Sequence, residues 1–232
     1  MSPWNQRDLT RRLLRSASHA GALAPLALLL WDYSQNQLGA DPVREITLRT
    51  GFTSLVLLLL SLACTPINLL FGWKQVLPLR RRMGLYAFLY VNLHLLTFLW
   101  LDYGFDWEFV LTGIGDQRYV LVGFAAFLLL IPLAATSFRW TMRRLGKKWK
   151  RLHQLVYVVG ILAIIHFFWL VKNVYTRPLL YGSILAFLLV LRIKPVRQRI
   201  LRGRRALARW WRSGLRVRTA VRSNGRPAAE AD

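Results

Sequence analysis

Histidines are the residues of this sequence most suited to carry chemistry. The chain has four, and two of them, His94 and His166, lie well inside long apolar segments. Ionisable side chains are costly inside a lipid bilayer, so those that occur there are candidates for function. Two neutral imidazoles from facing helices are what a b-type haem needs as axial ligands, and the sequence has no C-x-x-C-H motif for covalent haem attachment. We therefore predict a haem b site at this pair; the alternative for either residue is a hydrogen bond to a neighbouring helix.

The other two histidines, His19 and His153, lie near the starts of predicted helices. With a rise of about 1.5 Å per residue, His94 lies roughly 14 Å and His166 roughly 21 Å from the inner edges of their helices. His153 lies about 20 Å from His166 along one helix and about 140° around it. A second site near the cytoplasmic face is therefore predicted at His153, with His19 at a similar level. The spacing is compatible with one haem or with two.

Apolar segments long enough to cross a membrane must position these histidines. A membrane-spanning helix needs about 20 mostly apolar residues. Hydrophobic residues make up 55% of the 232-residue chain, which leaves enough apolar sequence for several such helices. The clearest segments are 51–71, 85–101, 119–137 and 152–171, and two shorter runs are 19–33 and 178–193. We predict an all-α polytopic membrane protein, a bundle of six transmembrane helices.

Basic residues indicate which helix ends face the cytoplasm. Connections rich in Lys and Arg stay on the cytoplasmic side of a membrane, and 28 of the 33 Lys and Arg fall on one side of the six-helix arrangement. Both termini are therefore predicted to be cytoplasmic, and the net charge of +23 reflects topology and not nucleic-acid binding. The chain divides into a basic N-terminal segment (residues 1–17), a membrane domain (18–193) and a basic, partly disordered tail (194–232).

Basic clusters on the predicted cytoplasmic side offer a further candidate site. Arg80 to Arg82 and the run from Arg143 to Arg151 could receive the phosphate of a flavin or an acidic electron donor. Positive charge that only fixes the topology is the alternative explanation, and the tail could also lie against anionic lipid. The four clear segments hold no carboxylate deep within them, which argues against an ion transporter. The single cysteine, Cys64, excludes an intrachain disulfide.

Several separate motifs, in order and with matching spacing, resemble the MsrQ (formerly YedZ) family. They are Leu38 to Val43, Leu93 to Leu95, Arg144 to Trp149 with Leu152-His153 and Val156-Tyr157, and Ile165 to Lys172. The likeness extends from about residue 18 to residue 191. This family is the haem-binding membrane subunit of bacterial MsrPQ methionine sulfoxide reductase systems, and it belongs with the ferric-reductase-like transmembrane domains.

The resemblance implies site residues, cofactors and partners. The family's haem ligands would map onto His94, His153 and His166, and His19 also lies in a family-like stretch. The partner would be MsrP, a periplasmic molybdopterin enzyme that reduces methionine sulfoxide in oxidised proteins. Electrons would come from the quinone pool or from a cytosolic flavin reductase, and FMN is associated with the family. Segment 85–101 carries only His94, unlike the paired histidines of the related NADPH oxidases, which disfavours a symmetric two-haem arrangement.

These observations predict an electron-transfer subunit in the bacterial inner membrane, with the catalytic reductase as its partner. Two alternatives remain, and the second of them belongs to another functional class. A stand-alone quinol or ferric reductase would release its product without a protein acceptor. A non-redox transporter or assembly scaffold would need no coloured cofactor.

Overall fold

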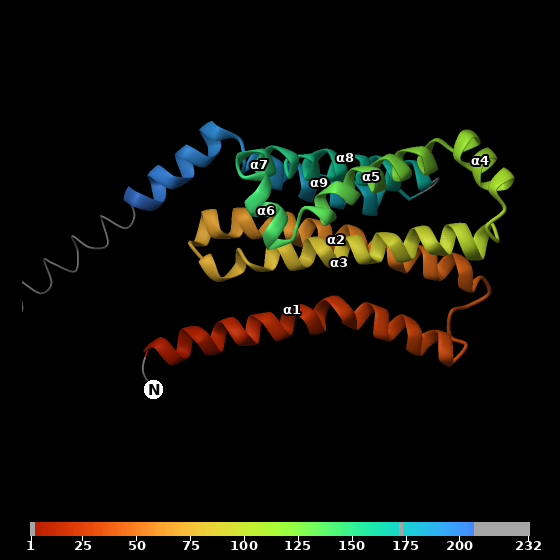
Figure 1. Ribbon diagram of the computed structural model, residues 1–232, viewed down its shortest axis with the longest axis horizontal. Helices are drawn as coiled ribbons and strands as arrows, with labels where there is room; N and C mark the ends of the chain where they lie inside the picture. Colours follow the sequence, from red (N-terminus) through yellow and green to blue (C-terminus); the bar gives the residue numbers. More distant parts are fainter. Residues whose placement is uncertain (1–2, 172–173, 207–232) are drawn as a thin grey trace, which may run out of the picture.

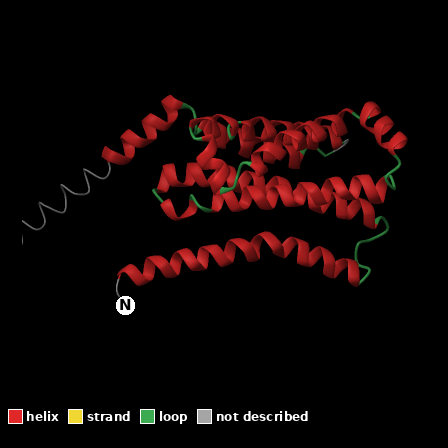
Figure 2. Ribbon diagram, viewed as in Figure 1, coloured by secondary structure: helices red, strands yellow, loops and turns green. Residues whose placement is uncertain are grey.

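The computed structural model describes residues 3–171 and 174–206, and every regular element in this part of the chain is a helix. Long helices run side by side along one axis, and short helices lie at the two ends of the bundle (Figures 1 and 2). The predicted all-α fold is confirmed. The elements are α1 (Pro3–Ser34), α2 (Pro42–Phe71), η1 (Lys74–Val76), α3 (Leu79–Leu96), η2 (Thr97–Asp102), α4 (Trp107–Asp116), α5 (Arg118–Ala135), α6 (Arg139–Leu145), α7 (Lys147–Leu152), α8 (Leu155–Leu170) and α9 (Thr176–Val190), followed by a helical segment Lys194–Ala206.

The termini of α2 show how local sequence sets an element's limits. The side chain of Asp41 accepts a hydrogen bond from the backbone N–H of Arg44, and Pro42 occupies the first turn, where its missing N–H is not needed. At the other end Gly72 has φ 76°, a left-handed conformation that glycine adopts without steric cost. These signals give a helix of 30 residues, long enough to cross a bilayer.

Four helices form the centre of the bundle, with α2 and α3 as one pair and α5 and α8 as the other. The central core cluster contains apolar side chains and small residues from all four, together with Ala22 of α1: Leu57, Leu58, Ala87, Tyr90, Ala126, Leu130 and Val159. Helix α1 packs on one side of the α2–α3 pair, and α9 packs against α2 and α8 (Figure 1).

Five of the described helices are long and apolar enough to cross a membrane. These spans are Asp8–Ser34, Pro42–Phe71, Lys74–Asp102, Arg118–Ala135 and Lys147–Leu170. The last predicted run differs, because α9 has only 15 residues and is followed, after a bend of 72°, by Lys194–Ala206. The described residues contain the six predicted membrane spans if this bent pair of helices is counted as one span.

The two ends of the bundle carry different connections. The N-terminal end of α1, helices α6 and α7, and the segment Lys194–Ala206 lie at one end, whereas α4 and the α1–α2 connection lie at the other (Figure 1). This separation agrees with the predicted partition of charge, and the assignment of the first end to the cytoplasm stays a prediction. Helix α1 continues unbroken through the predicted boundary at residues 17 and 18. Residues 207–232, including the stretch predicted to be disordered, lie outside the described residues.

Candidate haem-binding site

His94 and His166 face each other across the centre of the bundle. His94 lies on α3 and His166 on α8, and their ring centroids are 6.1 Å apart with an angle of 85° between the ring planes. The structure therefore brings together the two histidines that the sequence placed deep in the membrane.

Each of these rings is held by a backbone carbonyl from the partner helix of its own pair. Nδ1 of His94 lies 2.9 Å from the carbonyl oxygen of Thr47 on α2, and Nδ1 of His166 lies 2.6 Å from the carbonyl oxygen of Tyr119 on α5. A carbonyl oxygen only accepts, so each Nδ1 carries the proton and donates it. Each Nε2 is left with its lone pair, the arrangement that metal-binding histidines use.

This geometry fits a metal ion held between the two rings. Two imidazoles that bind one ion from opposite sides, with metal–nitrogen bonds of about 2 Å, have ring centres about 6 Å apart. The observed separation of 6.1 Å meets this requirement. Among the described residues no group of three or more His, Cys, Asp or Glu side chains comes together to hold a metal. A site with two protein ligands suits haem, because the porphyrin supplies the other ligands.

A short π-helix follows His94 and adds polar contacts around its backbone. The element η2 covers Thr97–Asp102, and π-helical turns are frequent at functional sites. The hydroxyl of Thr97 donates to the carbonyl oxygen of His94 at 2.8 Å, and it lies 3.2 Å from the hydroxyl of Thr47. Thr47 and Tyr119 were not predicted from the sequence, because both act through backbone oxygens that any residue type would supply.

His153 lies at the end of α7, and its hydrogen bonding differs from that of the central pair. Its Nε2 is 3.1 Å from the hydroxyl oxygen of Thr136, and its ring packs against Trp149 with centroids 4.1 Å apart. The Thr136 hydroxyl gives its own proton to the carbonyl oxygen of Pro132 at 2.6 Å. The Nε2 of His153 is therefore the donor, and Nδ1 is the nitrogen left with a lone pair. His153 therefore contacts Thr136 and Trp149 and takes no part in the contact between His94 and His166.

His19 lies apart from the central pair. It is exposed on α1, and its Nδ1 is 2.7 Å from the hydroxyl of Tyr86 on α3. Its ring meets the Tyr86 ring edge-on, with centroids 5.7 Å apart. This histidine links α1 to α3 on the outside of the four-helix centre.

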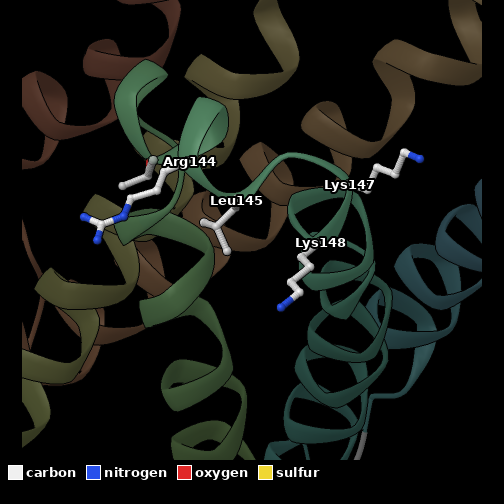
Figure 3. A pocket seen from close by; sticks show the side chains of 5 residues that line it. Arg144, Leu145, Lys147 and Lys148 are labelled. Carbon is white, nitrogen blue, oxygen red and sulfur yellow. The ribbon is translucent and has the colours of Figure 1, made fainter.

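The basic residues near the α6–α7 turn surround a surface hollow of about 600 Å³, lined by Thr141, Arg144, Leu145, Lys147 and Lys148. Figure 3 shows that the charged ends of Arg144, Lys147 and Lys148 point in different directions. Binding of a single phosphate requires donors that converge on it. The arrangement therefore gives no geometric support to the predicted flavin phosphate site at this turn, and it is compatible with charge that fixes the membrane topology.

Comparison with known proteins gives consistent matches. Residues 50–164 match the model of the ferric reductase like transmembrane component family, a region that includes His94 and His153. No solved structure matches the chain.

The most informative matches are to curated proteins named protein-methionine-sulfoxide reductase heme-binding subunit MsrQ. The protein of Xanthomonas campestris pv. campestris (strain 8004) is 48% identical over 185 residues, covering 77% of this chain and 85% of that protein. The protein of Xanthomonas axonopodis pv. citri (strain 306) is 45% identical over 216 residues, covering 90% and 92%. The protein of Bordetella pertussis (strain Tohama I) is 44% identical over 192 residues, covering 82% and 86%. At this identity, over most of both chains, the protein belongs to the MsrQ family of heme-binding subunits of protein-methionine-sulfoxide reductase.

Proposed function

We propose that this protein binds haem b between His94 and His166 and passes electrons through it to a partner that reduces methionine sulfoxide. The observation that carries this proposal is the facing pair of imidazoles, 6.1 Å apart, each with Nδ1 anchored on a backbone carbonyl. Bound haem supplies reversible one-electron reduction. The family name of the relatives supports both the cofactor and the reductase system.

The residues of the chain have three tasks in this proposal. His94 and His166 would hold the iron through Nε2, while the carbonyls of Thr47 and Tyr119 fix the tautomer and the orientation of the rings. The apolar residues of the four central helices, among them Leu58 and Leu130, exclude water from the centre. A dry, apolar surrounding also influences the reduction potential of the iron.

The location and the partners are part of the proposal. We place the protein in the bacterial inner membrane, with MsrP as the periplasmic acceptor and the quinone pool or a cytosolic flavin reductase as the donor. The support is the family membership and the predicted charge partition. FMN is proposed as a second cofactor on the same family basis. His153 is proposed as a ligand of a second haem, also on the basis of the family resemblance.

The test uses single substitutions of histidines in the purified protein. His94→Ala and His166→Ala should each remove the low-spin b-type absorption of the haem held at this pair. His19→Ala is the matched control and should keep it, because His19 contacts Tyr86 on the outside of the bundle. Unchanged spectra in both His94→Ala and His166→Ala would overturn the ligand assignment. The ratio of haem to protein, measured in wild type and in His153→Ala, would show how many haems bind and whether His153 holds one.

A further inference from the structure

The two helix pairs that hold the histidines repeat the same local pattern. His94 and Thr47 are 47 residues apart, and so are His166 and Tyr119. In each pair a glycine, Gly51 or Gly123, lies one helical turn after the residue that supplies the carbonyl. Each of these glycines precedes its histidine by 43 residues. The pattern therefore consists of a carbonyl, a glycine and a histidine at the same spacing in both halves.

Each glycine lies next to the Nδ1 and Cε1 atoms of its imidazole ring. A Cβ atom added at Gly51 would lie 2.9 Å from Nδ1 and 3.0 Å from Cε1 of His94. At Gly123 the corresponding distances to His166 are 2.7 and 2.9 Å. Non-bonded carbon atoms pack at about 3.5–4.0 Å, so the ring would have to move. In both cases the closest atom is the nitrogen that donates to the carbonyl.

Glycine is an unfavourable residue in the middle of a helix, so its presence at both positions calls for a reason. Close helix packing alone is the simplest alternative, since small residues let membrane helices approach. What a side chain would meet at either position is, however, the ring of the histidine, whereas at Gly21 on α1 it would meet no atom within 4 Å. At Gly160 on α8, where the neighbour is Leu185, the closest distance would be 3.2 Å, so the two contacts with histidine rings are the tightest among the glycines inside the described helices.

We propose that Gly51 and Gly123 are positioning residues for His94 and His166. Each leaves the space in which the ring lies close enough to the neighbouring helix for Nδ1 to reach the carbonyl of Thr47 or Tyr119. The glycines thereby help to set the tautomer and the angle of 85° between the ring planes. This inference rests on the proposed function, because it assigns the glycines to the haem ligands named there.

The first test compares Gly51→Ala and Gly123→Ala with the control Gly21→Ala. Loss of support for a metal-binding histidine typically weakens metal binding by about 10- to 100-fold, so haem should dissociate more readily from the first two variants at a comparable ratio. Their low-spin ferric electron paramagnetic resonance signal should also change, because it depends on the angle between the imidazole planes. Gly21→Ala should match wild type in both measurements. Wild-type haem retention and an unchanged signal in both test variants would overturn the inference.

The second test does not depend on haem. Gly51→Ala is placed in the wild-type and in the His94→Ala background, and all four proteins are produced under haem limitation and melted in detergent. The alanine should lower Tm when His94 is present and should not lower it when His94 is absent. If Gly51→Ala alone does not fold, folding of the double variant Gly51→Ala/His94→Ala would also support the inference. An equal loss in both backgrounds would show that Gly51 serves helix packing alone. Failure of the proposed function would instead appear as a wild-type haem spectrum in both His94→Ala and His166→Ala.

Discussion

At the scale of single residues, Arg192 compensates for a proline in a membrane helix. Pro66 lies inside α2 and has no N–H to give to the carbonyl of Leu62 four residues earlier. Nη2 of Arg192 donates to this carbonyl at 2.6 Å, and Nη1 donates to the hydroxyl of Tyr157 at 2.7 Å. A backbone carbonyl without a partner is costly in an apolar environment. Arg192 therefore provides the hydrogen bond that the Leu62 carbonyl of α2 lacks, and it joins the end of α9 to α2 and α8.

This arrangement predicts coupling between Arg192 and Pro66. Arg192→Ala should lower the free energy of unfolding by about 2 kcal/mol, because hydrogen bonds from a charged group to buried acceptors are lost. In a Pro66→Ala background the restored N–H reaches Leu62, and the loss should shrink by about 1 kcal/mol. Unfolding in detergent measures all four proteins. Arg197→Ala, at an exposed position, is the control for loss of charge. Strictly additive effects would contradict the coupling.

The candidate site was predictable at residue scale only where side-chain chemistry decides. His94 and His166 were selected because an imidazole deep in an apolar segment is rare and their depths were similar, and the structure brings their rings together. His153 and His19 were predicted with them from residue type and family resemblance, and the structure places both apart from the pair. The glycines were missed, although the shared spacing of 43 residues to each histidine is visible in the sequence. That signal is clear only once the paired helices are known.

At the scale of elements, Tyr90 enters the hydrogen-bond ladder of α1. The helix contains Pro25, and the buried hydroxyl of Tyr90 on α3 lies beside this turn. The N–H of Leu26 donates to the Tyr90 hydroxyl at 3.0 Å, and the hydroxyl donates to the carbonyl of Ala22 at 2.8 Å. One side chain thus replaces a helical hydrogen bond and attaches α1 to the centre of the bundle.

We expect Tyr90→Phe to weaken this attachment without affecting the haem site. The free energy of unfolding should fall by about 1–2 kcal/mol, because the buried N–H and carbonyl of α1 lose a shared partner. The haem spectrum should stay unchanged, since α1 supplies neither of the facing histidines. Tyr86→Phe is the matched control. Its hydroxyl contacts the exposed His19, so its effect should stay within about 0.5 kcal/mol. Loss of haem from Tyr90→Phe would contradict the division between α1 and the helices that carry the proposed ligands.

The long helices were predictable because their length and apolar composition are dictated by the bilayer. The details of their ends were not. The sequence predicted a short apolar helix from 178 to 193, but α9 ends at Val190 and the chain bends by 72° before Lys194–Ala206. The π-helix after His94 was also not predicted, because no residue pattern in this segment distinguishes it from a continuation of the α-helix.

At the scale of the whole molecule, charge and aromatic side chains are distributed along the bundle axis. The end with α6, α7 and the start of α1 carries the basic connections, and the end with α4 carries acidic residues such as Asp102 and Glu108 (Figure 1). Large exposed tryptophans lie near the ends of the spans: Trp73, Trp100, Trp107, Trp140 and Trp169. Tryptophan is enriched where membrane helices meet the water interface. Both distributions support a bundle that crosses the bilayer along its long axis.

The orientation of this bundle is testable because the chain has a single cysteine. Cys64 is buried, and its thiol donates to the carbonyl of Leu60, a bond that a serine hydroxyl can also make. In a Cys64→Ser background, Glu108→Cys on α4 and Lys148→Cys on α7 place one exposed thiol at each end of the bundle. A membrane-impermeant maleimide applied to spheroplasts should label Glu108→Cys, and it should label Lys148→Cys only after the inner membrane is disrupted. The reason is that 28 of the 33 basic residues lie on the α7 side of the predicted topology, and connections of this kind are retained in the cytoplasm. Labelling of Lys148→Cys in intact spheroplasts, with Glu108→Cys protected, would reverse the predicted orientation and would place the basic end, and not the acidic end, toward the proposed periplasmic acceptor.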